Sequence, residues 1–346
     1  MQNPRVVTVA QLSDFDEIID VRSPAEYAED HIPGAVSAPV LDDEQRAEVG
    51  TLYTQVSPFV AKKRGATLIA RNIAHHLENL FDDRPKQWKP LVYCWRGGQR
   101  SGAMAHILAQ VGWSTGRLDG GYKSYRRQVQ ADIETLPATL NFRVVCGPTG
   151  SGKSRLLHVL HEQGAQVLDL EALAQHRGSL LGNLPDEVQP AQKMFDSRLW
   201  DALRHFDTRH PVFVEAESKK IGLINTPESL LNKMHDADCI LIEAPVAARV
   251  QLLMEDYKHF LSDPVLLLER LTPLLPLHGR QVLDHWQILA EQGKWAELVE
   301  KLLAKHYDPA YRRSTANNFA RLPNAKTIQL DTLDHTTLLS ALATLI

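Results

Sequence analysis

The chain has 346 residues, 44% of them hydrophobic and 23% charged, a composition typical of a globular protein. This length exceeds one ordinary compact core, so we expect two domains. The formal net charge of −4 excludes a globally basic nucleic-acid-binding protein, although a local basic face would suffice for RNA. No apolar run approaches the roughly 20 residues needed to cross a bilayer. Residues 1–20 also lack a signal segment, so we expect a cytoplasmic protein with no membrane partner.

In the first domain, residues 1–137, apolar runs alternate with helical patterns, which predicts a parallel sheet covered by helices. Strands are expected at 17–21 and 90–94, helices at 101–111 and 122–135, and a glycine turn at 120–121. The last helix is expected to end near Pro137. This half of the chain is therefore predicted to be α/β.

The second domain, residues 138–346, repeats the alternation and is also predicted to be α/β, with a helical C-terminal part. Strands are expected at 141–146, 166–170, 212–215, 239–243 and 327–330, with helices over 250–305 and a closing helix at the end.

The three cysteines are too few and too far apart for a disulfide framework, and no CxxC pair indicates zinc. Each therefore serves either packing or chemistry. Cys146 and Cys239 lie inside apolar runs and are predicted to be core residues. Cys94 is left as the candidate reactive thiol.

Cys94 is expected where a buried strand ends and a glycine-containing loop leads into a helix. Loop amides and a helix N-terminus stabilise a thiolate and also bind anions. Gly97 and Gly98 fit a loop that needs positive φ or close backbone approach. We predict Cys94 as the catalytic residue, with Arg96, Gly97, Gly98 and Arg100 binding the anion. A structural cysteine, the alternative, normally has apolar neighbours instead of a glycine–arginine loop.

Three segments around this loop resemble motifs of the rhodanese family. Residues 20–27 (DVRSPAEY) and 31–35 (HIPGA) are similar to its N-terminal motif, and residues 118–122 (LDGGY) to its closing motif. Cys94 falls at the position that the family uses for catalysis. The resemblance implies an N-terminal rhodanese-like domain, in which we interpret Asp20, Arg22 and Glu26 as structural residues.

The spacing from Cys94 to Arg100 is C-x5-R, the loop length of cysteine phosphatases and of their rhodanese-fold relatives. A shorter loop is common in rhodaneses that handle only sulfur. The forked guanidinium of Arg100 suits a tetrahedral oxyanion. This loop therefore favours a phosphorylated donor over thiosulfate.

Residues 147–154 (GPTGSGKS) match the phosphate-binding pattern G-x-x-x-x-G-K-[ST] between an apolar strand and a helix. Backbone amides would wrap a diphosphate, Lys153 would reach its outer oxygens, and Ser154 could ligate Mg²⁺. The predicted binding residues of this loop are Gly147, Gly150, Ser151, Gly152, Lys153 and Ser154.

Acidic residues follow the next two strands: Asp169 and Glu171, then Glu215 and Glu217. Phosphate-loop proteins usually hold metal-linked water with an aspartate at the position of Glu215. We count Glu215 among the binding residues and assign no metal ligand, which leaves Mg²⁺ as an open option and predicts no tightly bound cofactor. Arg249 either contacts phosphate or lies in solvent.

The pairing of the two domains resembles the bacterial tRNA 2-selenouridine synthases over essentially the whole chain. The similar segments are 94–101, 147–154, 215–222 (EAESKKIG) and 306–311 (HYDPAY). The resemblance implies a transferase that replaces sulfur by selenium at the wobble 2-thiouridine of tRNA. It implies S-geranylation from geranyl diphosphate first and then reaction with selenophosphate. The sequence leaves open which loop holds which donor and whether ATP binds.

Two other classes of function remain at this stage: an ATP-dependent kinase or sulfur-activating enzyme with an appended rhodanese, and a rhodanese-fold binding module without chemistry. If tRNA is the partner, it needs a basic face. We expect that face at 126–127 and 219–220, with 62–64 and 312–313 as further patches, although any one patch can be merely solvated.

Overall fold

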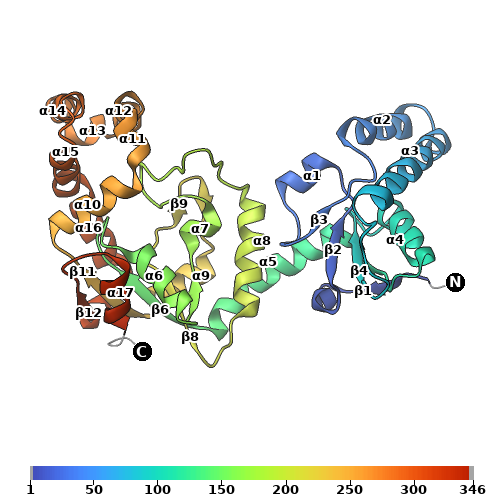
Figure 1. Cartoon of the computed structure of the whole chain (residues 1–346), viewed down its shortest axis with the longest axis horizontal. Helices are drawn as coiled ribbons and strands as arrows, with labels where there is room; N and C mark the ends of the chain where they lie inside the picture. Colours follow the sequence, from blue (N-terminus) through green and yellow to red (C-terminus); the bar gives the residue numbers. More distant parts are fainter. Residues whose placement is uncertain (1–2, 343–346) are drawn as a thin grey trace. The chain divides into compact units, whose positions relative to one another are not determined.

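Alternating strands and helices fold into two units in the computed structural model, which describes residues 3–342 (Figure 1). Unit 1 groups the residues up to Asp132 with Ala191–Asp201, and unit 2 groups Ile133–Pro190 with the residues from Ala202 onward. Helix α5 (Gly121–Thr139) runs through the boundary between 137 and 138, which stays a prediction. Pro137 lies inside the last turn of α5, which ends at Thr139, close to the end that was predicted near this proline.

Unit 1 contains one five-stranded sheet with strand order β1-β5-β4-β2-β3, and every neighbouring pair is parallel. Its strands are β1 (Arg5–Val7), β2 (Glu17–Asp20), β3 (Val36–Ser37), β4 (Pro90–Tyr93) and β5 (Gly116–Leu118). The central strand β4 is buried at all four residues. Its carboxyl end, where Cys94 follows, is therefore fixed by ladders on both sides.

The helices of unit 1 cover this sheet and begin at recognisable caps. They are η1 (Val9–Asp14), α1 (Pro24–Glu29), α2 (Asp43–Gln55), α3 (Pro58–Asn79), α4 (Gln99–Val111) and the first part of α5. Helix α1 starts with a capping box from Ser23 to Glu26 and a proline in its first turn. Met104 and Leu108 of α4 pack with Ile19 and Val92 of the sheet in one buried cluster.

Unit 2 contains a second five-stranded parallel sheet, with strand order β12-β11-β6-β8-β7. Its strands are β6 (Asn141–Cys146), β7 (Gln166–Leu168), β8 (Pro211–Glu215), β11 (Asp238–Glu243) and β12 (Lys326–Gln329). A short antiparallel hairpin follows β8, made of β9 (Lys220–Ile221) and β10 (Ile224–Asn225). Strand β6 is central, and later strands are added on either side of it, the arrangement in which open α/β sheets bind ligands.

The helices of unit 2 are more numerous after β11. They are α6 (Lys153–Glu162), α7 (Leu170–Ala174), α8 (Gln192–His205), α9 (Glu228–His235), α10 (Val246–Asp256), α11 (Lys258–Ser262), α12 (Pro264–Leu271), η2 (Thr272–Leu274), α13 (Leu275–His278), α14 (Arg280–Glu291), α15 (Trp295–Leu302), η3 (Leu303–Tyr307), α16 (Asp308–Asn318), η4 (Leu322–Asn324) and α17 (His335–Leu342). Helices α6 and α17 share one core cluster with β6, β11 and β12. The first ten residues of α8 belong with unit 1.

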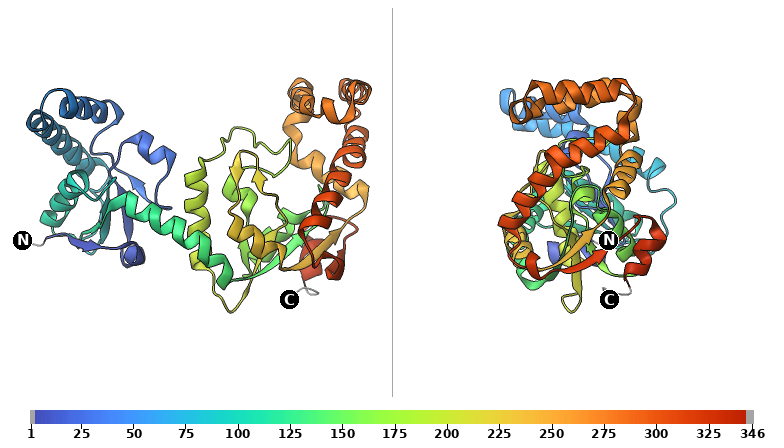
Figure 2. Two further views of the ribbon diagram at one scale, coloured as in Figure 1. Left: turned by 180° about the vertical axis from the view of Figure 1, so that it is seen from behind. Right: turned by 90° about the vertical axis from the view of Figure 1, so that its left-hand side faces the viewer.

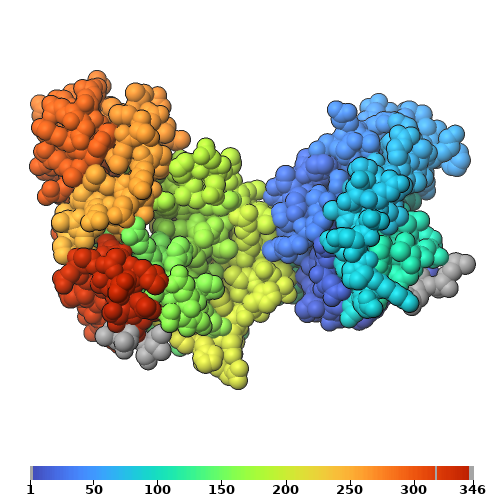
Figure 3. Space-filling model, viewed as in Figure 1, coloured from blue at the N-terminus to red at the C-terminus, as the bar shows by residue number. Residues whose placement is uncertain are grey.

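Residues 258–302 form a helical lobe of unit 2 with an apolar core of its own, centred on Trp286, Leu271 and Leu298. The lobe groups at one end of unit 2 in both views of Figure 2, and its atoms are coloured orange in Figure 3. A π-helical turn, η3, joins it to α16. No helix among residues 3–342 is long and apolar enough to cross a membrane. The predicted α/β architecture with a helical C-terminal part is confirmed.

Candidate active sites

Cys94 lies at the carboxyl end of β4, with its side chain only 3% exposed. Its Sγ is 3.2 Å from the Oγ of Ser101, the third residue of α4, and that hydroxyl lies 3.3 Å from the carbonyl oxygen of Gly98. A neutral thiol can donate to Ser101 while Ser101 donates to Gly98. A thiolate would instead accept from the same hydroxyl. Ser101 is thus a partner for either form of the sulfur.

The loop after Cys94 is held by the glycine pair at the end of β5. The backbone N–H of Tyr122 donates to the carbonyl of Cys94 at 2.8 Å. A Cβ at Gly121, whose φ is +57°, would collide with that same carbonyl oxygen. Gly97 has φ of +65°, and a Cβ there would lie 2.7 Å from the oxygen of Leu118. Only glycine fits at these two positions, because both conformation and space exclude a side chain.

Gly98 meets neither of the conditions expected for it. Its φ is −93°, and a Cβ there would have no atom within 4 Å. Arg96 is exposed at the same turn. The roles predicted for Arg96 and Gly98 in anion binding stay predictions.

Arg100 does not point its guanidinium over the loop as a free group. It donates to both carboxylate oxygens of Glu26 in α1, at 2.6 and 3.3 Å. Burial by itself would raise the pKa of Glu26, but the hydrogen bonds and positive charge of Arg100 outweigh it and lower that pKa. The side chain that we interpreted as structural thus contacts the predicted anion-binding arginine.

Asp20 and Arg22 form a different kind of contact, fully inside the unit. The guanidinium of Arg22 pairs with the Asp20 carboxylate at 2.5 Å and donates to the carbonyl of Asp30 at 2.6 Å. The hydroxyl of Tyr93 also donates to Asp20, at 2.6 Å. Both charged side chains are buried, so their pairing fixes the end of β2 beside the end of β4.

The second site is the loop between β6 and α6. Gly150 and Gly152 have φ of +76° and +86°, so the pattern places glycine where the backbone turns left-handed. A Cβ at Gly147 would collide with the side chain of Ser151, whose hydroxyl is buried and has no partner within the part of the chain that the structure describes. The ammonium of Lys153 donates to the Gly147 carbonyl at 2.9 Å. Lys153 thus links the end of the loop to its first residue.

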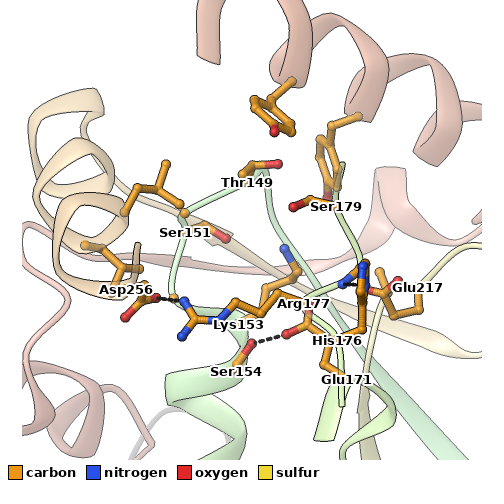
Figure 4. Close-up of a pocket in the computed structure, with 18 of the residues that line it drawn as sticks. Thr149, Ser151, Lys153, Ser154, Glu171, His176, Arg177, Ser179, Glu217 and Asp256 are labelled. Atoms are coloured by element: carbon orange, nitrogen blue, oxygen red, sulfur yellow. Dashed lines mark hydrogen bonds and ion pairs between the residues drawn. The ribbon is translucent and has the colours of Figure 1, made fainter. Parts of the chain in front are cut away.

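Four acidic residues gather beside this loop from the ends of β7 and β8. Ser154 donates to Glu171 at 2.9 Å, and the backbone N–H of Glu171 donates to Glu215 at 2.8 Å. Asp169 instead caps α7 by accepting from the N–H of Ala172. Figure 4 shows Lys153, Ser154 and Glu171 converging in the pocket. Within residues 3–342, no group of three or more His, Cys, Asp or Glu is arranged to hold a metal ion by itself.

Crowding raises the pKa of these carboxyl groups. Burial, and then repulsion from Glu171, raises the pKa of Glu217 to about 8. Burial, and then repulsion from Asp169, raises the pKa of Glu215 well above its usual value. Burial also raises the pKa of Glu171, although the positive charge of Lys153 opposes this shift. At neutral pH the pocket therefore carries less negative charge than its composition indicates.

Arg249 does not lie in solvent, one of the two options left open by the sequence, but contacts the backbone of the phosphate loop. It is 4% exposed and donates from Nε and Nη2 to the carbonyl of Thr149, at 2.9 and 2.8 Å. The same guanidinium pairs with Asp308 at 2.6 Å. Arg249 thus links Asp308, in the segment 306–311, to the backbone of the phosphate loop.

A pocket of about 670 Å³ opens over the phosphate loop. Besides the predicted residues, it is lined by His176, Arg177, Tyr257 and Tyr307, which sequence reasoning missed. Arg177 extends into the pocket toward Asp256 (Figure 4). Its buried Nη1 lies 3.7 Å from that carboxylate and has no hydrogen-bond partner among the described residues. No motif marks these residues, because they come from three separate segments. Tyr307 alone had a signal, as part of the segment 306–311.

One residue of the predicted basic patch at 126–127 is not on the surface. Arg126 is 9% exposed and pairs with Asp196 at 3.0 Å inside unit 1. It also donates to the carbonyl of Lys193 at 3.0 Å. Arg127, Lys219 and Lys220 are exposed. The expectation that Arg126 contacts tRNA is wrong, because its charge is already used to bind the segment 191–201.

Comparison with known families matches both units. Residues 7–128 match the family described as rhodanese-like domain, and residues 140–266 match the family described as tRNA 2-selenouridine synthase AAA domain. The predicted succession of a rhodanese-like domain and a domain of the phosphate-loop class is confirmed.

Three named relatives are similar to this chain over most of its length. The chain is 34% identical over 302 residues to a tRNA 2-selenouridine synthase of Nitrosomonas europaea, which covers 85% of this chain and 77% of the relative. It is 32% identical over 337 residues to the enzyme of that name from Aeromonas salmonicida, covering 88% and 89%. A third relative of that name, from Alcanivorax borkumensis, is 32% identical over 328 residues, covering 85% and 88%.

Proposed function

Because the chain belongs to the tRNA 2-selenouridine synthase family, we propose that it is a transferase that replaces the sulfur of a 2-thiouridine in tRNA by selenium. The observation that carries this function is the similarity to named synthases across both units, 85% of the chain in one case. The Cys94 loop and the phosphate loop supply the chemistry that such a replacement needs. Action on tRNA places the enzyme in the cytoplasm.

The first step is S-geranylation at the phosphate loop. The sulfur of the wobble 2-thiouridine bonds to C1 of geranyl diphosphate, the C1–O bond breaks, and diphosphate leaves with the electron pair while N3 of the base loses its proton. Lys153 and Arg177 both reach the pocket and can neutralise the leaving group. The protonated Glu217 lowers the repulsion that an entering diphosphate meets.

The second step takes place at the Cys94 loop with selenophosphate. The thiolate of Cys94 bonds to C2 of the base as nucleophile, the bond from C2 to the geranylated sulfur breaks, and geranyl thiol leaves. The selenium of selenophosphate then bonds to C2, and the bond from C2 to the Cys94 sulfur breaks, which returns the thiolate. Hydrolysis of the P–Se bond releases phosphate and the 2-selenouridine. The C-x5-R loop suits a tetrahedral anion, and Arg100 becomes available to it when Glu26 releases the guanidinium.

Magnesium fits the phosphate-loop pocket only together with a substrate. Mg²⁺ commonly takes one or two protein ligands and completes its shell with phosphate oxygens and water. Ser154 and Glu171 are the residues that would hold it, since their side chains already meet at 2.9 Å beside the loop. The buried Glu215 has one carboxylate oxygen without a partner, which would orient a metal-bound water. Bound there, the ion would neutralise charge on the diphosphate.

The test is reconstitution with purified protein and tRNA that carries 2-thiouridine, followed by mass spectrometry of the nucleosides. We expect a geranylated nucleoside with geranyl diphosphate alone and 2-selenouridine when selenophosphate is added. Selenium incorporation that needs ATP and ignores geranyl diphosphate would overturn the two-step scheme and restore the kinase alternative. No selenium incorporation under any donor combination would overturn the function itself.

A further inference from the structure

A small apolar cavity adjoins the phosphate-loop pocket inside unit 2. Its volume is about 60 Å³. It shares part of its wall with the larger pocket, namely Thr149, Ser179, Leu253, Tyr257 and Tyr307. The two spaces therefore meet at a mouth made of the phosphate loop and two tyrosines. A ligand whose charged end lies on the loop has the cavity within reach.

The inner wall of the cavity is hydrocarbon and aromatic. Helices α10, α11, α12 and α15 contribute it, with residues such as Met254, Phe260, Leu298 and Val299. Beyond the mouth, the indole of Trp295 carries the only side-chain N–H among the described lining residues. A nucleobase there would lose its hydrogen bonds to water with little replacement, whereas a hydrocarbon chain loses none.

The volume of the cavity also limits the size of the group that can bind in it. One water-sized group needs roughly 10–15 Å³ of such space. The cavity therefore accepts about four to six such groups, the size of a single isoprene unit. The first isoprene unit of a diphosphate donor would lie at the mouth, between Lys153 and the rings of Tyr257 and Tyr307.

We propose that this cavity is the subsite for the distal isoprene unit of the donor, and that it sets the donor's chain length. The inference rests on the proposed use of a prenyl diphosphate at the phosphate loop. The proposal also gives the helical lobe a function. Residues 258–302 close the far end of the cavity and therefore limit the length of the donor's hydrocarbon chain. A donor of two isoprene units fills mouth and cavity, one unit leaves the cavity empty, and three exceed it.

The experiment compares donor preference in the full-length protein. Val299→Phe and Met254→Phe fill the cavity from two half-buried positions. Trp295→Ala opens its far end. Val265→Phe is the matched control, because it makes the same change at a residue of α12 that is 66% exposed and outside this wall. Probes are inorganic diphosphate and dimethylallyl, geranyl and farnesyl diphosphates, read by calorimetry and by mass spectrometry of prenylated tRNA.

Filling should lower the geranyl-to-dimethylallyl affinity ratio about tenfold or more, because the distal unit loses its buried surface. Trp295→Ala should raise the ratio of farnesyl to geranyl diphosphate affinity. All variants should bind inorganic diphosphate as the wild type does, and Val265→Phe should keep the wild-type affinity ratios. Unchanged ratios in both filling variants, with normal geranylation, would overturn the subsite and leave the enzyme function intact. If the wild-type protein binds every prenyl diphosphate no more tightly than inorganic diphosphate, both the subsite and the geranyl step are wrong. Selenium incorporation then shows whether the proposed transferase function still holds.

Discussion

The Cys94 loop and the phosphate loop have similar positions in their sheets but carry different side chains. Each follows the central strand of a parallel sheet and leads into a helix, so each points backbone N–H groups at an anion. In the first loop the cation, Arg100, is held 2.6 Å from a carboxylate, Glu26. In the second, Lys153 rests on a neutral carbonyl at 2.9 Å. Arg100 must separate from Glu26 before it can bind an anion, whereas Lys153 can bind one directly.

This difference separates the chemistry of the two loops. The first holds a sulfur, Cys94, with a hydroxyl 3.2 Å away that can follow its protonation. The second has no cysteine among the described residues that line its pocket and instead gathers Glu171, Glu215 and Glu217 with raised pKa values. A loop with a thiol suits chalcogen transfer, and a loop with a lysine and carboxyl groups of raised pKa suits binding and release of a diphosphate.

The largest effect should come from the sulfur that only one loop has. We expect Cys94→Ala to lower 2-selenouridine formation by at least about a thousandfold, because the proposed nucleophile has no substitute. Cys146→Ala and Cys239→Ala are the controls. Both sulfurs are buried in strands of unit 2, so their loss should cost about 1 kcal/mol of stability and leave product formation intact. Nucleoside mass spectrometry decides, and normal product with Cys94→Ala would refute the assignment.

Next in size is the cation of the second loop. Lys153→Ala should weaken geranyl diphosphate binding by about 10- to 150-fold, since a hydrogen bond to a charged group contributes roughly 1.5–3 kcal/mol. Because the side chain only bridges to Gly147, the fold should persist. Calorimetric titration with geranyl diphosphate and with ATP measures this, and Lys219→Ala is the exposed control. Equal affinity of mutant and wild type for both ligands would show that the donor binds elsewhere.

A pH dependence should distinguish the carboxyl-rich loop from the sulfur loop. Glu217 has its pKa raised to about 8, so it is neutral below that pH and charged above it. An anionic donor is repelled only by the charged form. Without magnesium, geranyl diphosphate affinity should fall up to about tenfold as pH rises from roughly 7 to 9. Glu217→Gln, which stays neutral throughout, should flatten the profile, and a variant profile as steep as wild type would exclude Glu217 as the cause.

A smaller change should follow from releasing Arg100. Glu26→Gln removes the competing charge yet keeps an amide at the third position of α1, where glutamine still completes the capping box. We expect inorganic phosphate, as a probe of the first loop, to bind about threefold more tightly, because partly exposed ion pairs contribute up to about 1 kcal/mol. Glu29→Gln at the end of the same helix is the control. Weaker phosphate binding in Glu26→Gln would mean that the pair holds the loop in its binding shape.

The smallest effect concerns the tRNA surface outside both loops. Replacing Arg127, Lys219 and Lys220 by alanine should lower tRNA affinity about two- to threefold. It should reduce the slope of log affinity against log salt by about 0.7 to 0.9 for each phosphate that the variant no longer neutralises. Filter binding at several salt concentrations measures both quantities. If affinity and slope stay at wild-type values, these residues are solvated charges, and the patches at 62–64 and 312–313 are the next to test.

Local patterns were enough to predict the position of each loop. The strand before Cys94 and the strand before Gly147 are short apolar runs, and both form within a residue or two of their predicted bounds. Of the two glycines predicted to need positive φ or close backbone approach, Gly97 has a φ of +65°, whereas Gly98 has a φ of −93°. Such features depend on a few adjacent residues, so a single sequence shows them.

The sequence by itself determined the order of the two α/β domains and the positions of the candidate cysteine loop and the phosphate loop, because each depends on residues close together in the chain. Only the tertiary structure decided which distant groups meet them. It brings Glu26 to Arg100 across 74 positions and Asp308 to Arg249 across 59. It also buries Arg126 against the segment 191–201 and places Arg177, Tyr257 and Tyr307 around one pocket. Those contacts depend on the packing of whole helices and sheets, which no spacing along the chain encodes.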